Sequence, residues 1–138
     1  MKTILLNILA VAIGVILGSM LNMFIINISS SIIPPPEGAD VTTIEGLKSS
    51  MHLFQPINYL MPFLAHALGS LVGAVLAGLI AASHRNRFSM AIGIFFLIGG
   101  ILNIYMLPSP LWFSICDLSL AYLPMGFLGG RLAMMIRK

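Results

Sequence analysis

The sequence predicts an all-α membrane protein, a single bundle of four transmembrane helices within residues 1–138. Of its residues 59% are hydrophobic and only 8% are charged, and the mean hydropathy is +1.04. This leaves too little polar surface to cover a water-soluble globule. Four separate apolar stretches each approach the roughly 20 residues that a helix needs to cross a bilayer. Because lipid offers no hydrogen bonds to the backbone, we expect all four to span as helices.

The spans are expected at about residues 3–27, 58–83, 88–107 and 111–136, joined by a long loop at 28–57 and two short turns. No soluble domain remains outside these spans. The first span begins with Lys2 and resembles a secretory signal in outline. Its apolar run is longer than a typical signal core and lacks a clear cleavage site, so we interpret it as an anchor.

The basic residues predict the orientation of the bundle. On one side of the membrane lie Lys2, Arg85, Arg87, Arg131, Arg137 and Lys138, and on the other only Lys48. The positive-inside rule then predicts a multi-pass protein of the bacterial inner membrane with both termini in the cytoplasm. The opposite face is mildly acidic and carries Glu37, Asp40, Glu45 and Asp117. The net charge of +3 therefore reflects topology, and no nucleic-acid partner is expected.

The long loop is expected to contain a short amphipathic helix at about residues 41–54. Its apolar residues recur at helical spacing at Val41, Ile44, Leu47, Met51 and Phe54. Thr42 and Glu45 fit a capping box, with Asp40 as a rival cap. The helix would lie on the outer membrane surface, as a lid or docking surface over the bundle or as a plain connector.

A weak internal repeat suggests two tandem helical hairpins. Residues 18–26 (GSMLNMFII) match residues 99–107 (GGILNIYML) in character, and prolines follow each segment. The second and fourth spans each carry a tyrosine close to a proline, Pro62 or Pro124, and both prolines are expected to bend their helices. A duplication would be a parallel repeat with a central site shared by both hairpins. Chance similarity between apolar segments is the alternative.

Small residues predict where the helices pack, because they let transmembrane helices approach closely. The expected packing positions are Gly14, Gly18, Gly69, Gly73, Gly126 and Gly129. They would form the seam of the bundle, or alternatively the interface of a homo-oligomer.

Polar side chains inside the spans are costly in lipid unless they are paired, so each is a candidate site. Those toward the outer side are Asn22, Tyr59, His66, Asn103, Asp117 and Tyr122. If their helix faces converge, they line a ligand-binding pocket that opens outward. Alternatively, the asparagines are interhelical hydrogen-bonding groups, the tyrosines are aromatic-belt anchors, and His66 bonds a helix carbonyl. Ser114 and Asp117 also fit a capping box at the start of the last helix.

The sequence contains no phosphate-binding glycine loop, G-x-S-x-G, HExxH or CxxC motif, so no catalytic residues are predicted. Ten methionines with His52, His66 and Cys116 are soft ligands. They form no tight ligand motif, and we expect no metal and no cofactor.

The function expected from these observations is a non-enzymatic interaction or accessory protein. It would pack with lipid, with itself as a homo-oligomer, or with a larger membrane complex. The alternatives are a small transporter or channel with an outward-facing polar pocket and, less favoured, an intramembrane enzyme. A cavity with convergent polar groups would favour transport, and a dry closed bundle would favour interaction.

Overall fold

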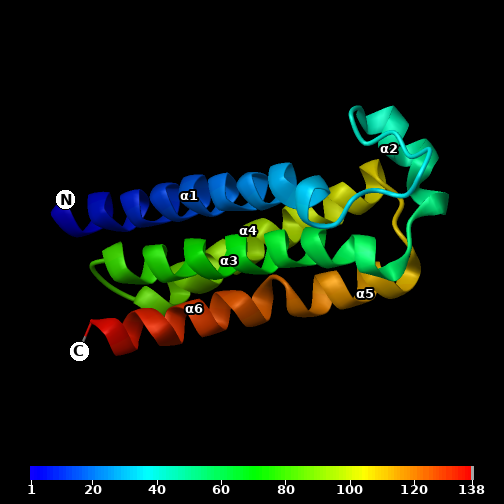
Figure 1. The fold of residues 1–138 in the computed structure, drawn as a ribbon. Helices are drawn as coiled ribbons and strands as arrows, with labels where there is room; N and C mark the ends of the chain where they lie inside the picture. Colours follow the sequence, from blue (N-terminus) through cyan, green and yellow to red (C-terminus); the bar gives the residue numbers. More distant parts are fainter. Residues whose placement is uncertain (138) are drawn as a thin grey trace.

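The computed structural model describes residues 1–137, so Lys138, one of the basic residues used for the orientation, lies outside the described residues. Four segments are long and apolar enough to cross a membrane (Figure 1). They are α1 (Lys2–Ile32), Pro56–Ile80, α4 (Arg85–Met106) and Leu111–Ile136. The second consists of the short 3-10 helix η2 (Pro56–Tyr59) and α3 (Leu60–Ile80), and the fourth of α5 (Leu111–Leu120) and α6 (Leu123–Ile136). The predicted all-α membrane bundle is confirmed.

Helix α1 continues beyond the predicted end of its span, to Ile32. The polar residues in its last turns remain helical, and the hydroxyl of Ser29 donates to the carbonyl of Ile26. The helix ends where Ile33 adopts an extended conformation. Since Ile33 precedes a proline, the ring of Pro34 excludes the helical conformation there.

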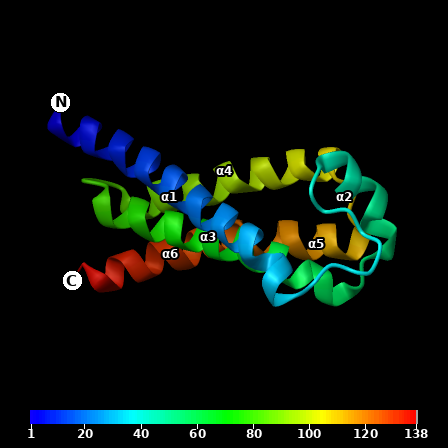
Figure 2. The same ribbon diagram turned by 45° about the horizontal axis from the view of Figure 1, so that its top comes forward.

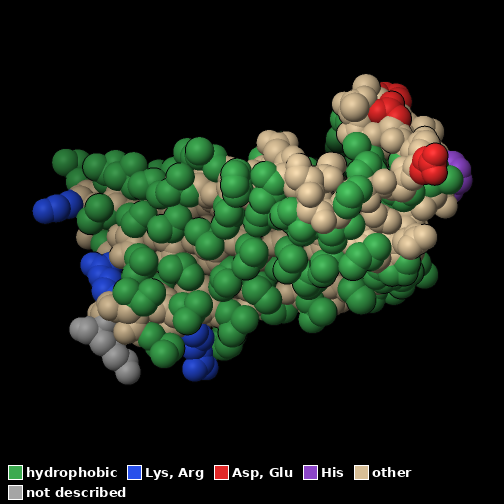
Figure 3. Space-filling model, viewed as in Figure 1, with side chains coloured by type: hydrophobic (Ala, Val, Ile, Leu, Met, Phe, Trp, Pro, Cys, Tyr) green, Lys and Arg blue, Asp and Glu red, His purple; other side chains and the backbone are tan. Residues whose placement is uncertain are grey.

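Helix α3 lies at the centre of the bundle and packs against α1, α4 and α6 (Figures 1 and 2). All of its buried residues except Met61 are small, among them Ala65, Ala74 and Ala77. Large apolar side chains cover the outside of the bundle (Figure 3). Small residues inside and large ones outside are the arrangement expected when the helices pack closely and lipid is the solvent.

Glycines allow α1 and α3 to cross in direct backbone contact. A Cβ atom built on Gly73 would lie 2.6 Å from the carbonyl oxygen of Gly14, and one built on Gly18 would lie 2.7 Å from that of Gly69. Both distances are too short for a real Cβ, so these positions tolerate no side chain without a shift of the helices. The four glycines therefore pack within this chain.

Helix α6 uses glycines in the same way. A Cβ atom on Gly126 would lie 3.1 Å from Cα of Gly93 in α4, and one on Gly129 would lie 2.6 Å from Cβ of Ala74 in α3. Gly93 was not among the packing positions expected from the sequence.

The fourth span is broken between α5 and α6. Ala121 and Tyr122 interrupt the helix, and Pro124 lies in the first turn of α6. A proline fits there because its missing N–H is not needed in a first turn. Pro62 lies likewise in the first turn of α3 rather than in mid-span.

The amphipathic segment is shorter than predicted. It forms α2 (Ile44–Ser50) and the 3-10 turn η1 (Met51–Leu53) at one end of the bundle (Figure 1). The predicted capping box is wrong, because the cap is Thr43, whose hydroxyl accepts from the backbone N–H of Gly46 at 2.9 Å. Thr42 is engaged instead by the carboxylate of Asp40, to which its N–H and its hydroxyl both donate.

The internal repeat stays a prediction. Asn22 and Asn103, at matching positions of the repeat, line one cavity. Gly18 and Gly99 also match in sequence, but Gly18 contacts α3 and a Cβ on Gly99 would meet nothing within 4 Å. The two hairpins therefore differ in their helix contacts at this position.

Candidate functional site

A cavity of about 280 Å³ lies where the spans meet the loops at the acidic end of the bundle. Its polar lining comes from η2, all four spans and the turn after α4: Asn22, Tyr59, His66, Asn103, Ser109, Ser114 and Asp117. Five of the six residues predicted to line an outward pocket are in this set, and the sixth, Tyr122, contacts the lining residues Asp117 and His66 without lining the cavity itself. Ser109 could not be recognised from the sequence as a site residue, since it follows the third span in a turn, and Ser114 was expected only as a helix cap.

His66 and Asp117 form the centre of the site. Nδ1 of the imidazole donates to the carboxylate and lies 2.9 Å from Oδ1 and 3.0 Å from Oδ2. The side chain of Asp117 is 4% exposed and that of His66 is 16% exposed. Both side chains line the cavity, and the carboxylate is the more enclosed of the two.

Tyr122 is the third member of this network. Its hydroxyl donates to Oδ2 of Asp117 at 2.7 Å, and its ring stacks on His66 with centroids 5.8 Å apart. The break between α5 and α6 brings the ring into the bundle, where it is 2% exposed. Gly100 makes the space for it, since a Cβ there would lie 2.5 Å from the tyrosine hydroxyl oxygen.

Asp117 is therefore not a helix cap, and this expectation is corrected. Helix α5 begins at Leu111, behind Pro110. The hydroxyl of Ser114 donates to the carbonyl of Pro110 and shares a hydrogen bond of 2.8 Å with the hydroxyl of Ser109. These local contacts leave the carboxylate of Asp117 to His66 and Tyr122. His66, for its part, bonds this carboxylate rather than a helix carbonyl.

The hydrogen bond to Asp117 leaves Nε2 of His66 available for other chemistry. In the neutral ring Nε2 is an acceptor, and in the imidazolium ion it is a donor. The network can therefore hold or release a proton beside the cavity.

Two buried oxygens at the cavity lack a hydrogen-bond partner among the described residues. They are Oδ1 of Asn22 and the hydroxyl of Tyr59, and Tyr59 is only 4% exposed. Buried polar atoms are normally paired, so both atoms are suited to bind a molecule in the cavity. The Oδ1 atom of Asn22 does not serve as an interhelical hydrogen-bonding group.

Aromatic rings form one wall of the cavity. The ring of Tyr59 lies 4.8 Å from that of Phe113 and 5.9 Å from that of Phe54, measured between centroids. Both phenylalanines line the cavity. On the outer side of this wall the ring of Trp112 contacts Tyr59 edge-on at 5.6 Å.

The loop segment that contains α2 contributes the apolar side chains Leu47, Met51 and Phe54 to the lining. The backbone of α2 packs chiefly against η1 rather than against the spanning helices. Its position beside the bundle end is visible in Figure 2. The segment thus covers part of the cavity without being a component of the helix bundle.

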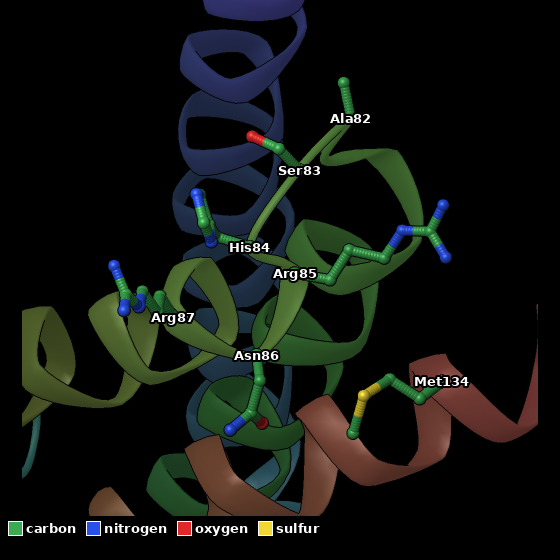
Figure 4. Close-up of a pocket in the computed structure, with 7 residues that line it drawn as sticks. All are labelled: Ala82, Ser83, His84, Arg85, Asn86, Arg87 and Met134. Atoms are coloured by element: carbon green, nitrogen blue, oxygen red, sulfur yellow. The ribbon is translucent and has the colours of Figure 1, made fainter.

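A larger surface hollow, about 570 Å³, lies at the basic end near the turn between α3 and α4 (Figure 4). Arg85 and Arg87 line it but point away from each other in Figure 4. Nε of Arg85 donates to the carbonyl of Ala81. Because the two guanidinium groups do not converge on one position, this hollow is a weaker candidate than the cavity at the acidic end.

No known protein family matches the chain, and no curated protein and no solved structure is significantly similar to it. The candidate site is therefore interpreted from its own chemistry.

Proposed function

We propose that this chain is a small transporter of the bacterial inner membrane that holds its solute in the cavity beside His66 and Asp117. The observation that carries the proposal is the buried network of His66, Asp117 and Tyr122 next to a polar cavity. Ionisable groups inside a membrane span are costly and commonly belong to solute or proton pathways. The convergence of polar groups favours transport over the interaction protein that the sequence alone suggested.

The charge distribution supports an orientation in which the cavity faces outward. Lys and Arg side chains gather at one end of the bundle, and Asp and Glu side chains gather at the end with α2 (Figure 3). By the positive-inside rule the basic end lies in the cytoplasm, together with both termini. The cavity then opens toward the outer face of the membrane.

The proton chemistry of the network supports coupling of solute binding to protonation. When Asp117 is ionised, the pair has no net charge with an imidazolium and one negative charge with a neutral imidazole. Both residues line the cavity, and His66 has the more exposed side chain of the two, so a proton can reach the pair from the cavity. A solute that prefers one charge state is thereby linked to proton uptake or release.

Between the cavity and the basic end of the bundle, closely packed helix residues close the route in this state. Helix α3 places Ser70 and Ala74 there, both fully buried, and the contact between Gly14 and Gly73 continues the closure. Transport through this bundle therefore requires a second state in which the seam opens and the cavity is accessible from the other side.

Cysteine labelling in oriented vesicles tests this function. In a Cys116→Ser background, Asn103→Cys places a thiol in the cavity and Gly99→Cys places one a turn earlier on the lipid-facing side of α4. We expect a charged, membrane-impermeant maleimide to label Asn103→Cys from both sides of the membrane and Gly99→Cys from neither. His52→Cys, on the exposed η1 turn, reports which side is the outer one.

Labelling of Asn103→Cys from the outer side alone would contradict transport and leave a solute-binding protein. Absence of labelling from either side would show that water does not reach the cavity and would favour the interaction protein over the transporter. Labelling of His52→Cys only from the cytoplasmic side would overturn the orientation.

A further inference from the structure

We infer that the cavity selects small organic cations, such as alkylammonium ions, over neutral and anionic molecules of the same size. This inference rests on the proposed solute site and adds its ligand class. Its support is the charge of the cavity lining, the unpaired oxygens, the aromatic wall and the cavity volume.

The charge of the lining favours a cation. Among the described residues that line the cavity, none is Lys or Arg, and Asp117 supplies a carboxylate. His66 balances this carboxylate only while its ring is protonated. With a neutral imidazole the site carries one uncompensated negative charge in a setting of low dielectric, where the attraction for a cation is strong.

The unpaired oxygens require a ligand that donates. A side-chain amide oxygen can only accept hydrogen bonds, and Oδ1 of Asn22 has no donor among the described residues. The hydroxyl of Tyr59, also without a partner there, can accept as well. An ammonium group has only N–H donors and matches both oxygens. The oxygens of a carboxylate ligand can only accept, so they could form no hydrogen bond with Oδ1 of Asn22.

The aromatic wall supports the same class. The rings of Phe54, Tyr59 and Phe113 border the cavity, and cations are attracted to the faces of aromatic rings. The remaining lining includes apolar side chains such as Met23, Ile26 and Leu107, which suit a short alkyl part.

The cavity volume, about 280 Å³, limits the ligand to a size below that of typical drug-like molecules, whose pockets measure roughly 300–1,000 Å³. The outer surface near the loop segment that contains α2 is also acidic, with Glu37, Asp40 and Glu45 against the single Lys48. Such a surface raises the local concentration of cations.

Protons compete with the ligand for the same negative charge. The titratable groups at the cavity or bonded to it are His66 from α3, Asp117 and Tyr122 from the fourth span, and Tyr59 from η2. Helices α1 and α4 contribute the amides Asn22 and Asn103, and the loop segment that contains α2 contributes apolar side chains. An imidazolium at His66 would neutralise Asp117, so the negative charge that attracts an organic cation is that of the pair with a neutral imidazole.

The test compares butylammonium, butanol and butyrate, which differ in charge but little in size, as ligands of the purified full-length protein. Trp112 is the single tryptophan, and its ring contacts Tyr59 in the cavity wall, so its fluorescence reports binding. Isothermal titration gives an independent dissociation constant. We expect butylammonium to bind about tenfold or more tightly than either control.

Two variants test the named groups. Asp117→Asn should weaken butylammonium binding by about tenfold or more. Asn22→Leu, which leaves the buried pair untouched, should weaken it several-fold and keeps the test decisive if Asp117→Asn does not fold. Tyr105→Phe, at an exposed side chain of α4 that is not among the lining residues, serves as the matched control and should leave the affinity nearly unchanged.

Equal binding of butanol or butyrate, no binding of butylammonium, or unchanged affinity in folded Asp117→Asn and Asn22→Leu would each overturn the inference. Failure here is distinguishable from failure of the transport proposal. If Asn103→Cys is labelled from both sides while butylammonium does not bind, the cation preference is wrong and transport stands.

Discussion

His66 of α3 and Asp117 of α5 lie 51 residues apart in the sequence and 2.9 Å apart in space, measured from Nδ1 to Oδ1. The pair joins two helices that otherwise share little packing surface at this level. Because both groups are polar and lie in a membrane span, neither is stable there without the other or an equivalent partner. The pair is therefore the position where substitutions are most informative.

Removing either partner alone should destabilise the bundle more than removing both. His66→Ala leaves the carboxylate without its counter-ion, and Asp117→Ala leaves the imidazole unpaired, each at a cost of about 3–5 kcal/mol in the free energy of unfolding. The double variant should cost less than either single variant. Unfolding in detergent by added SDS measures all three, and strictly additive losses would argue against a direct interaction.

The hydroxyl of Tyr122 should contribute measurably to stability. Tyr122→Phe deletes the 2.7 Å hydrogen bond to Asp117 and should lower the free energy of unfolding by about 1.5–3 kcal/mol, the range for hydrogen bonds to charged groups. Tyr105→Phe is the matched control, because Tyr105 is 82% exposed and should tolerate the loss of its hydroxyl. An equal effect of the two variants in the same SDS titration would contradict the network.

The seam between α1 and α3 should reject even one methyl group. Gly73→Ala sets a Cβ 2.6 Å from the carbonyl oxygen of Gly14 and should destabilise the bundle by about 1–3 kcal/mol through overpacking. Gly73→Leu should prevent helix packing altogether. Gly99→Ala, whose Cβ meets nothing within 4 Å, should instead stabilise by about 0.5–1 kcal/mol. The melting temperature in detergent separates the two directions, and a Gly73→Ala variant as stable as the parent would refute the seam.

The turn between α3 and α4 contains a strained residue. His84 has φ of 45°, in the left-handed region, which costs a residue with a Cβ about 1–2 kcal/mol. His84→Gly should therefore leave stability unchanged or raise it by up to about 1 kcal/mol, after the entropy of glycine in the unfolded chain is counted. His84→Ile, with a branched Cβ, should lower it. Thermal unfolding of both variants checks this, and a large loss in His84→Gly would assign the side chain another role.

The turn before α2 should weaken in acid. Hydrogen bonds from the side chain and the backbone of Thr42 lower the pKa of Asp40 from its ordinary value of 3.8. A lowered pKa in the folded state stabilises the turn above about pH 4, and this contribution disappears as the pH falls through the folded pKa. Thr42→Val should raise the pKa of Asp40 toward 3.8, while Thr42→Ser should preserve the shift. A carboxyl NMR titration measures each value, and an identical pKa in both variants would contradict the role of the hydroxyl.

The sequence by itself determined the spans, the acidic and basic ends and the set of polar residues toward the acidic end. Hydropathy and charge are properties of local segments, and the insertion of each segment into a bilayer depends on its own hydropathy and flanking charge. The glycine positions could be recognised for the same reason, since Gly14 and Gly18 stand on one face of one helix.

Only the tertiary structure decided how these residues are paired. The sequence did not show that Asp117 bonds His66 and Tyr122 rather than capping α5, or that Thr43 caps α2 in place of Thr42. A capping pattern reports what a helix end can do locally. Which partner a carboxylate takes depends on the position of a helix many residues away, and that position follows from the close packing of glycines and alanines throughout the bundle.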